Sequence, residues 1–168
     1  MAILKIYYVP DPVLRRKAHK VSDFGNEFQT LVDDMIETLR DAPGVGLAAP
    51  QVGVSERLIV VEYGDDEDET VPKKLVVVAN PEIIEPSEEV IEGLEGCLSV
   101  PDLVGEVERN VKIVVKGLNR YGKPVKIKAE DWIARIFQHE IDHLDGILFT
   151  DRTDNVWKPS DEDEVVAD

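Results

Sequence analysis

Two histidines four residues apart are the pattern in this sequence that most directly suggests chemistry. His139 and His143 enclose Glu140 in the run His-Glu-Ile-Asp-His, and the whole chain has three histidines. Residues four apart on a helix share one face, so both imidazoles can reach one metal ion, with Glu140 close enough to act on a metal-bound water. Apolar neighbours predict a buried helix, in which two imidazoles without partners would be costly. The run therefore predicts a metal site rather than a surface helix that carries these residues by chance.

A catalytic metal site of this kind needs a third protein ligand, and the sequence offers two candidates. Glu162 follows His143 by 19 residues, the spacing of a thermolysin-type endopeptidase, but its acidic surroundings lack the apolar periodicity of a helix. Cys97 is the only cysteine and lies in an apolar segment between Gly96 and Pro101, where the chain can pass close to a helix. An inert buried thiol is the alternative interpretation. Beside a helix that lacks its third ligand, we favour Cys97.

A third segment of interest runs Gly-Val-Gly-Leu-Ala-Ala-Pro-Gln over residues 44–51. Gly44 and Gly46 allow close approach of the backbone, and Gln51 ends the segment with an amide that can donate a hydrogen bond. No Lys-Ser/Thr pair follows, so the segment is not a phosphate loop. Taken alone, it predicts only an ordered glycine-rich turn.

The scaffold that must position these residues can be predicted from apolar periodicity. Helices are expected over residues 27–40, ended by Pro43 and Gly44, and over residues 130–144, followed by Gly146 as a left-handed cap. Strands are expected at residues 58–63, 74–79, 104–107, 111–117 and 124–128, with a turn at Asn80–Pro81 and a hairpin connection at 117–122. The predicted fold class is α+β, with short antiparallel strands packed around a central helix that bears the His-Glu-x-x-His motif.

Length and charge restrict the possible functions. The 168 residues suit one domain, expected over residues 1–153, followed by a short, acidic, flexible tail at residues 154–168. A formal net charge of −16 disfavours nucleic acids and anionic membranes as partners. The acidic run 65–69 is expected to be a solvated loop tip. No signal peptide or membrane-spanning run is present, so we expect a cytoplasmic monomer with a reduced thiol.

Three segments together resemble the signature motifs of the peptide deformylases. They are Gly-Val-Gly-Leu-Ala-Ala-Pro-Gln at 44–51, Glu-Gly-Cys-Leu-Ser at 95–99 and Gln-His-Glu-Ile-Asp-His-Leu-Asp-Gly at 138–146. Asp-Pro-Val-Leu-Arg at 11–15 is similar to the family's N-terminal element, and the similarity runs from about residue 4 to Arg152. The His-Glu-x-x-His pattern alone is shared by many metalloproteases, whereas all three motifs in one chain are highly specific.

The resemblance implies a metal held by Cys97, His139 and His143, with a fourth position for water and Glu140 as the general acid and base. The family's metal is commonly Fe(II), and Zn, Ni or Co can substitute. The implied substrate is the N-formyl group on the initiator methionine of a new polypeptide.

The resemblance also implies roles around the reacting carbonyl. The side chain of Gln51 and the backbone N–H of Leu98 would line an oxyanion hole, and Gly46 would contact the peptide backbone. An apolar pocket for the methionine side chain is expected beside the metal, lined by Val45, Trp132 and Ile136.

Further comparison with the family gives one expected brace and two departures. Glu95 is expected to pair with Arg109 and so to support the cysteine segment. Many members have glycine where this chain has Asp102. Several carry a basic C-terminal helix that docks on the ribosome, and the acidic tail after Asp154 departs from that mode of transient ribosome association.

A metal-stabilised binding module is the alternative outside enzymes, although Glu140 argues against it, because a structural site needs no additional carboxylate.

Overall fold

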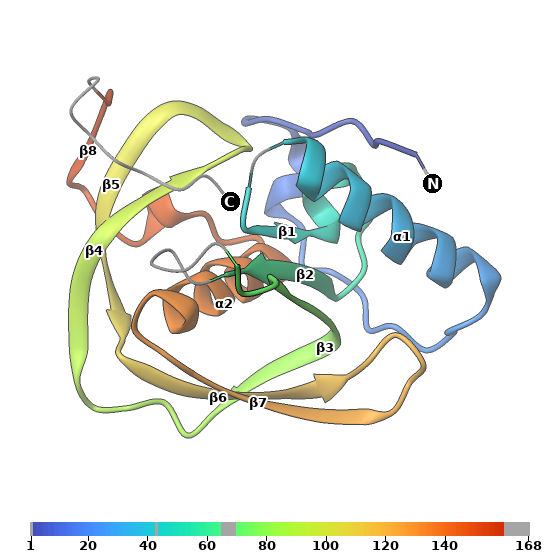
Figure 1. Ribbon diagram of the computed structural model, residues 1–168. Coiled ribbons are helices and arrows are strands. Elements are labelled where there is room, and N and C mark those ends of the chain that lie inside the picture. The colour runs from blue at the N-terminus through green and yellow to red at the C-terminus, as the bar shows by residue number, and fades with distance from the viewer. Residues whose placement is uncertain (1, 43, 65–69, 160–168) are drawn as a thin grey trace.

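The computed structural model describes residues 2–42, 44–64 and 70–159 (Figure 1). Within these ranges it has two α-helices, α1 (Asn26–Asp41) and α2 (Asp131–Leu144). A five-stranded sheet has the order β1-β2-β3-β6-β7, formed by β1 (Gly46–Ala48), β2 (Leu58–Tyr63), β3 (Lys74–Ile84), β6 (Lys112–Leu118) and β7 (Pro124–Glu130). A three-stranded sheet has the order β4-β5-β8, formed by β4 (Val90–Cys97), β5 (Val100–Asn110) and β8 (Val156–Trp157).

Helix α2 lies in the middle of the molecule. In Figure 1 the long strands β4 and β5 pass on one side of it, and β6 and β7 pass below it. Every residue from Ala134 to Leu144 is buried, including the polar ones. All strand pairs of both sheets are antiparallel. The predicted α+β fold with a central helix bearing the His-Glu-x-x-His motif is therefore confirmed.

Helix α1 packs on the five-stranded sheet at the end formed by β1 and β2. Its buried residues Phe28, Val32, Met35 and Leu39 recur at three- and four-residue steps, so they form one apolar face. That face packs on Leu47 of β1 and on the inward side of β2. The helix extends the predicted range 27–40 by one residue at each end.

Strand β3 is longer than predicted, because the expected turn at Asn80–Pro81 is wrong. The chain remains in the strand through both residues, and the register with β6 shifts between Ala79 and Glu82. Asn80 has a left-handed φ of 52°, and its side-chain amide bonds both backbone groups of Val21 at 2.8 and 2.9 Å. The residues that predicted a turn therefore form a β-bulge.

The remaining predicted elements differ mainly in extent. β2 has the predicted bounds, whereas β5 extends well beyond residues 104–107 in both directions, and β4 was not predicted. The glycine-rich segment is β1 followed by a 3₁₀ helix, η2 (Ala49–Val52). Two further 3₁₀ helices are η1 (Pro12–Arg15) and η3 (Phe149–Asp151).

The predicted C-terminal tail is described only at its beginning. Val156 and Trp157 pair with β5, so the chain contacts the three-stranded sheet beyond Asp154. The acidic loop 65–69 and the end of the tail, including Glu162, lie outside the described residues.

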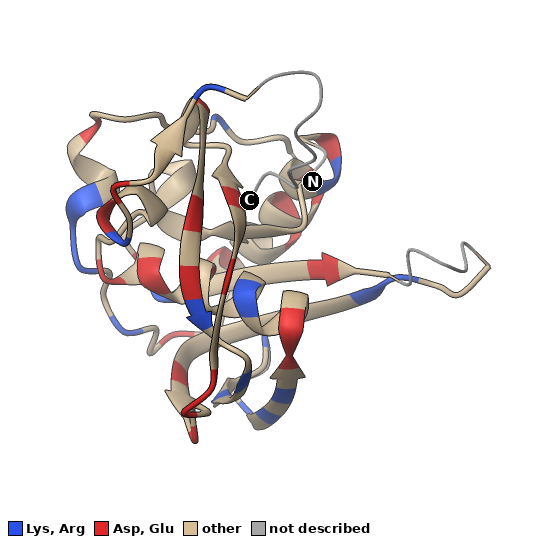
Figure 2. Cartoon of the chain, turned by 90° about the vertical axis from the view of Figure 1, so that its left-hand side faces the viewer, with Lys and Arg blue, Asp and Glu red and all other residues tan. Residues whose placement is uncertain are grey.

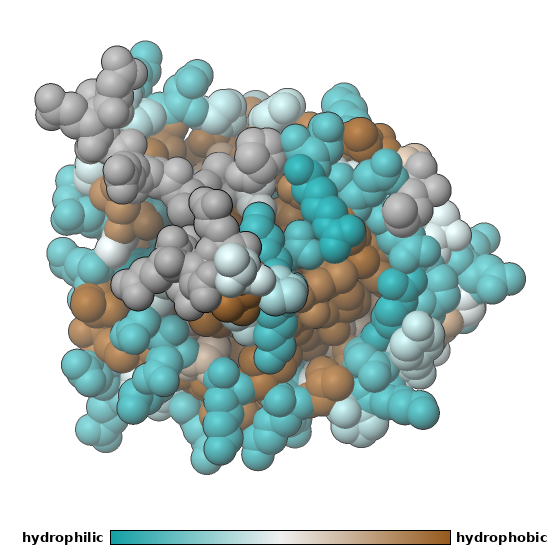
Figure 3. All heavy atoms as spheres, viewed as in Figure 1, coloured by the Kyte–Doolittle hydropathy of each residue, from teal (hydrophilic) through white to brown (hydrophobic). Residues whose placement is uncertain are grey.

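Charged and apolar surface residues are both widely distributed. Acidic residues recur along strands and helices in Figure 2, and apolar side chains reach the surface between hydrophilic ones in Figure 3. Among the described residues, the large exposed apolar side chains occur singly or as adjacent pairs in separate segments, for example Tyr121 alone and Val90 with Ile91. Scattered apolar residues of this kind are ordinary on folded proteins. Neither described α-helix combines the length and apolarity that a bilayer crossing requires.

Candidate metal centre

Cys97, His139 and His143 converge on one buried point. Cys97 is the last residue of β4, and the two histidines lie one helical turn apart on α2. The Sγ of Cys97 lies 3.4 Å from Nε2 of His143, which lies 3.2 Å from Nε2 of His139. The three donor atoms are all within 4.8 Å of one another. The expected meeting of the lone thiol with the two imidazoles is therefore present in the structure.

The protonation of the two imidazoles fits a cation between them. Nδ1 of His139 lies 2.9 Å from Oε1 of Glu95, a carboxylate acceptor, so Nδ1 carries the proton and a lone pair on Nε2 faces the cluster. Burial, the neighbouring His139 and the charge of Arg109 lower the pKa of His143 well below its usual range. Neutral imidazoles are the form that binds metals, and two nitrogens with one sulfur suit Fe or Zn better than Mg or Ca.

Glu95 connects this cluster to a buried arginine. Arg109 donates from Nε and Nη2 to the two oxygens of Glu95, each at 2.9 Å, so the expected pair is confirmed. Burial raises the pKa of Glu95, but the hydrogen bonds from Arg109 and His139 outweigh it and hold the pKa far below its usual range. The carboxylate is therefore ionised and can fix the orientation of His139.

Asp142 is a charged neighbour of this network whose contacts the sequence motifs did not predict. It accepts from Nη1 of Arg109 at 2.6 Å and from two nitrogens of Arg152 at 2.7 and 3.0 Å. Asp142 lies three residues after His139, on the same side of α2. The sequence does contain a signal for it, because Asp142 is a charged residue on the face of the predicted helix 130–144 that is expected to be buried, and buried charges need partners.

Glu140 is completely buried and lies against Gly46 of β1. A Cβ placed on Gly46 would lie 2.5 Å from Oε2 of Glu140, closer than real Cβ atoms come. Glycine at this position therefore gives the carboxylate its space. β1 is the first strand in the order of the five-stranded sheet, so Gly46 lies on an edge strand.

Gln51 points its amide nitrogen toward the thiol. Its Oε1 accepts from the backbone N–H of Ala48 at 2.9 Å, which fixes the direction of the amide. Its Nε2 then lies 3.6 Å from Sγ of Cys97 and 3.2 Å from Oγ of Ser99. Leu98 lies in the turn between Cys97 and Ser99, so its backbone is adjacent to the same point.

The backbone at the start of β5 accounts for one departure from the pattern of the family that the chain resembles. Asp102 has a φ of 66°, in the left-handed region where glycine is unstrained. Aspartate is one of the few other residues that enter this region readily. The backbone conformation that suits glycine is therefore present with Asp102 in its place.

Two of the three expected apolar lining residues, Trp132 and Ile136, lie on α2, and the third, Val45, directly precedes β1. Ile136 is buried in the core cluster of α2, and Val45 and Trp132 are partly buried against the same cluster. The three side chains therefore belong to one extended hydrophobic core, and Val45 and Trp132 also line one hollow.

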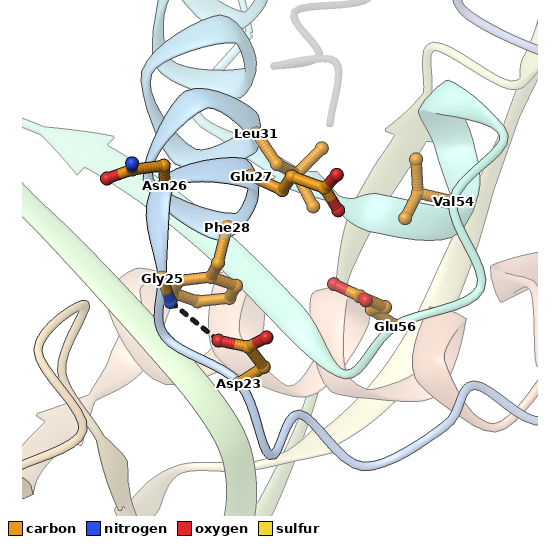
Figure 4. Close-up of a pocket in the computed structure, with 8 residues that line it drawn as sticks. All are labelled: Asp23, Gly25, Asn26, Glu27, Phe28, Leu31, Val54 and Glu56. Atoms are coloured by element: carbon orange, nitrogen blue, oxygen red, sulfur yellow. Dashed lines mark hydrogen bonds between the residues drawn. The ribbon is translucent and has the colours of Figure 1, made fainter.

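A separate hollow of about 500 Å³ lies at the start of α1 (Figure 4). Three carboxylates, Asp23, Glu27 and Glu56, surround it together with the apolar side chains of Phe28, Leu31 and Val54. None of its lining residues belongs to the metal cluster, so this hollow is distinct from the candidate site.

Comparison with known proteins agrees with the geometry of this site. The family described as polypeptide deformylase matches residues 3–158. The chain belongs to the peptide deformylase family. Peptide deformylases are metal-dependent enzymes that remove the N-formyl group from newly made peptides. Membership favours this activity over the endopeptidase and binding-module alternatives.

Curated relatives and solved structures give the same family. A peptide deformylase of Symbiobacterium thermophilum is 53% identical over 164 residues, which cover 98% of this chain and 73% of the relative. One of Halothermothrix orenii is 52% identical over 153 residues, covering 90% and 94%. A structure from Legionella pneumophila has a TM-score of 0.82 and 47% identity, covering 90% and 86%. A class I type b peptide deformylase from Acinetobacter baumannii, bound to Met-Ala-Ser, has a TM-score of 0.83 and 41% identity, covering 90% and 99%.

Proposed function

We propose that this chain removes the formyl group from N-formyl-methionyl nascent peptides, using one divalent metal held by Cys97, His139 and His143. The observation that carries the proposal is the convergence of one sulfur and two nitrogens beside the buried carboxylate of Glu140. We further propose Fe(II) as the physiological metal, with Zn, Ni or Co able to replace it, because this donor set suits borderline metals.

Glu140 is the proposed general acid and base. The metal, when bound, lowers the pKa of a water and polarises the formyl carbonyl. Glu140, whose carboxylate lies against Gly46 of β1, accepts the proton of the attacking water and delivers it to the departing amine nitrogen. Its burial excludes bulk water from this proton transfer.

Gln51 and Leu98 are the proposed donors to the oxygen of the reacting carbonyl. The amide of Gln51 is held by Ala48, so its N–H groups are oriented before the substrate arrives. Leu98 is the residue directly after Cys97, so its backbone N–H lies next to the proposed metal ligand. Loss of one such preorganised donor in other enzymes costs about 2.7–4 kcal/mol of transition-state stabilisation.

The edge of β1 is the proposed binding surface for the peptide backbone. β1 is the first strand of the five-stranded sheet, and Gly46 lies on it beside Glu140. An extended peptide can add to such an edge through backbone hydrogen bonds. The methionine side chain is placed among Val45, Trp132 and Ile136, and the Met-Ala-Ser bound to the A. baumannii relative agrees with such a substrate.

We also propose a cytoplasmic monomer with one catalytic domain over residues 1–153. Any ribosome association would be transient, and residues 154–168, which are acidic, offer no basic surface for it.

The first test separates metal binding from proton transfer. Glu140→Gln should keep the metal content of the native protein, prepared anaerobically with Fe(II), while kcat on formyl-Met-Ala falls about 10²- to 10⁴-fold. Cys97→Ser should lose metal and activity together, because a hydroxyl is a much weaker ligand than a thiolate. Glu27→Gln, an exposed change on α1, is the matched control. Full metal content in Cys97→Ser, or unchanged kcat in Glu140→Gln, would contradict the assignment.

A further inference from the structure

Arg135 is a buried arginine on α2 that none of the three sequence motifs includes. It lies one helical turn before His139, and 8% of its surface is exposed. Its Nη1 donates to Oε2 of Glu95 at 2.7 Å and to the backbone oxygen of Val107 at 2.8 Å. Its Nη2 donates to the backbone oxygen of Ile91 at 2.9 Å. One guanidinium therefore joins α2 to β4, to β5 and to the carboxylate of Glu95.

Gly93 on β4 makes room for this guanidinium. A Cβ at Gly93 would lie 2.7 Å from Cζ of Arg135 and 2.8 Å from Nε and Nη2. These distances are shorter than side-chain contacts allow, so any other residue at position 93 must displace the arginine. Glycine at position 93 and arginine at position 135 therefore depend on each other: the guanidinium of Arg135 occupies the space that a side chain on β4 would need.

The contacts of Glu95 show what this feature does. Oε1 of Glu95 accepts from Nη2 of Arg109 and faces Nδ1 of His139, each at 2.9 Å. Oε2 accepts from Nε of Arg109 at 2.9 Å and from Nη1 of Arg135 at 2.7 Å. Arg109 is also drawn toward Asp142, so it is shared between two carboxylates. Arg135 is therefore the second donor to Oε2 of Glu95. Together with Arg109 it fixes the orientation of the carboxylate, so that Oε1 points at Nδ1 of His139.

We propose that Arg135 is a positioning residue that orients the imidazole of His139 through Glu95, and that Gly93 is the gap that admits it. The inference rests on the proposed function in one respect, the role of His139 as a metal ligand. Outer partners of ligating histidines fix the ring orientation, and their loss in other metal sites costs 10- to 100-fold in metal affinity or activity. Because the guanidinium of Arg135 donates to Glu95 and to backbone oxygens of β4 and β5, its removal is expected to act on kcat rather than on KM.

The experiment compares Arg135→Met, Arg135→Lys, Gly93→Ala and the double variant Gly93→Ala/Arg135→Met in the full chain. Three properties are measured: the rate at which Co(II) passes to a chelator, the visible spectrum of the Co(II) protein, and kcat and KM on formyl-Met-Ala. Arg120→Met is the matched control, since Arg120 is a partly buried arginine that joins α1 to a distant hairpin through Asp33 and Gln29.

The expected result is a metal release rate raised about 10- to 100-fold in Arg135→Met, with a changed Co(II) spectrum, a lower kcat and an unchanged KM. Arg135→Lys should recover part of the loss, because it keeps one donor to Glu95. Gly93→Ala should shift the same properties without removing a charge. In the double variant the alanine should add little, because the thinner methionine leaves space for its methyl group.

Several outcomes would overturn the proposal. One is a loss of thermal stability alone, with metal release and spectrum as in the native protein, which would make Arg135 only a brace between α2 and β4. Another is full additivity of the two changes, which would separate Gly93 from Arg135. If Arg135→Met does not fold, Arg135→Lys and Gly93→Ala decide by the same measurements. A native protein that binds no metal and deformylates nothing would instead refute the proposed function.

Discussion

At the scale of single residues, the candidate site depends on where a side chain is missing. Gly46 has an ordinary φ, so its backbone would accept alanine. What excludes alanine is Oε2 of Glu140, which lies where the Cβ would be. The resemblance to the family implies that Gly46 contacts the peptide backbone, and the structure adds this separate reason for glycine.

Gly46→Ala should therefore lower kcat/KM on formyl-Met-Ala by about 10²-fold, because a shift of about 1 Å in a catalytic group costs that much. Circular dichroism and metal content should remain close to those of the native protein. Gly25→Ala, whose added Cβ meets only the flexible side chain of Asp23, is the control and should retain full activity. Native kcat/KM in Gly46→Ala would show that the position of Glu140 does not depend on this contact.

At the scale of elements, the bulge in β3 sets how the strand passes from β2 to β6. Ala79 and the residues before it pair with β2, and Glu82 to Ile84 pair with β6 after the shift in register. Asn80 stabilises this change, because its left-handed backbone and its two bonds to Val21 tie the strand to the N-terminal segment. The bulge thus fixes both the sheet and the segment that leads into α1.

Asn80→Gly should isolate the contribution of the side-chain amide, since glycine accepts the same φ. Loss of two partly buried hydrogen bonds should reduce the free energy of unfolding by about 1–3 kcal/mol, measured by urea denaturation. Glu85→Gly is the control, because Glu85 is exposed and has the same φ of 52°. Equal stability of Asn80→Gly and the native protein would show that the bulge does not need the amide.

At the scale of the whole molecule, the dominant property is negative charge. The chain has 35 acidic against 19 basic residues, and Figure 2 shows the acidic ones spread over several elements. Many of the arginines are already engaged in ion pairs, among them Arg40, Arg109 and Arg152. The excess carboxylates therefore repel one another across the surface, which destabilises the compact state.

Added salt should raise the thermal midpoint, because the screening length falls from about 10 Å at 0.1 M to about 3 Å at 1 M. Each 1 kcal/mol gained corresponds to about 2–4 °C for a chain of this size. The measurement is differential scanning calorimetry in NaCl at pH 7. Near pH 4.5, the calculated isoelectric point, the net charge is close to zero and the salt effect should nearly vanish. A midpoint that falls with salt at pH 7 would refute this account.

The sequence by itself determined the features that depend on local periodicity. The three- and four-residue steps of apolar residues predicted α1 and α2 to within a residue or so, and the same period placed His139, Glu140 and His143 on one helix. The β2 run was predicted with its bounds because it is apolar and short. Cys97 could be proposed as the third ligand because no other thiol exists in the chain.

Only the tertiary structure decided which distant segments meet. The register of β4 on β5 delivers Cys97 to α2, and the gap at Gly93 admits Arg135 to Glu95. Likewise, the bond from Asn80 to Val21 turned an expected turn into a bulge. The contacts of Cys97 with His143, of Arg135 with Glu95 and of Asn80 with Val21 join residues 40 or more positions apart, and their energies depend on side-chain distances that no local pattern encodes. A helix period repeats within the chain's own neighbours, whereas a packing gap exists only after the strands and helix have come together.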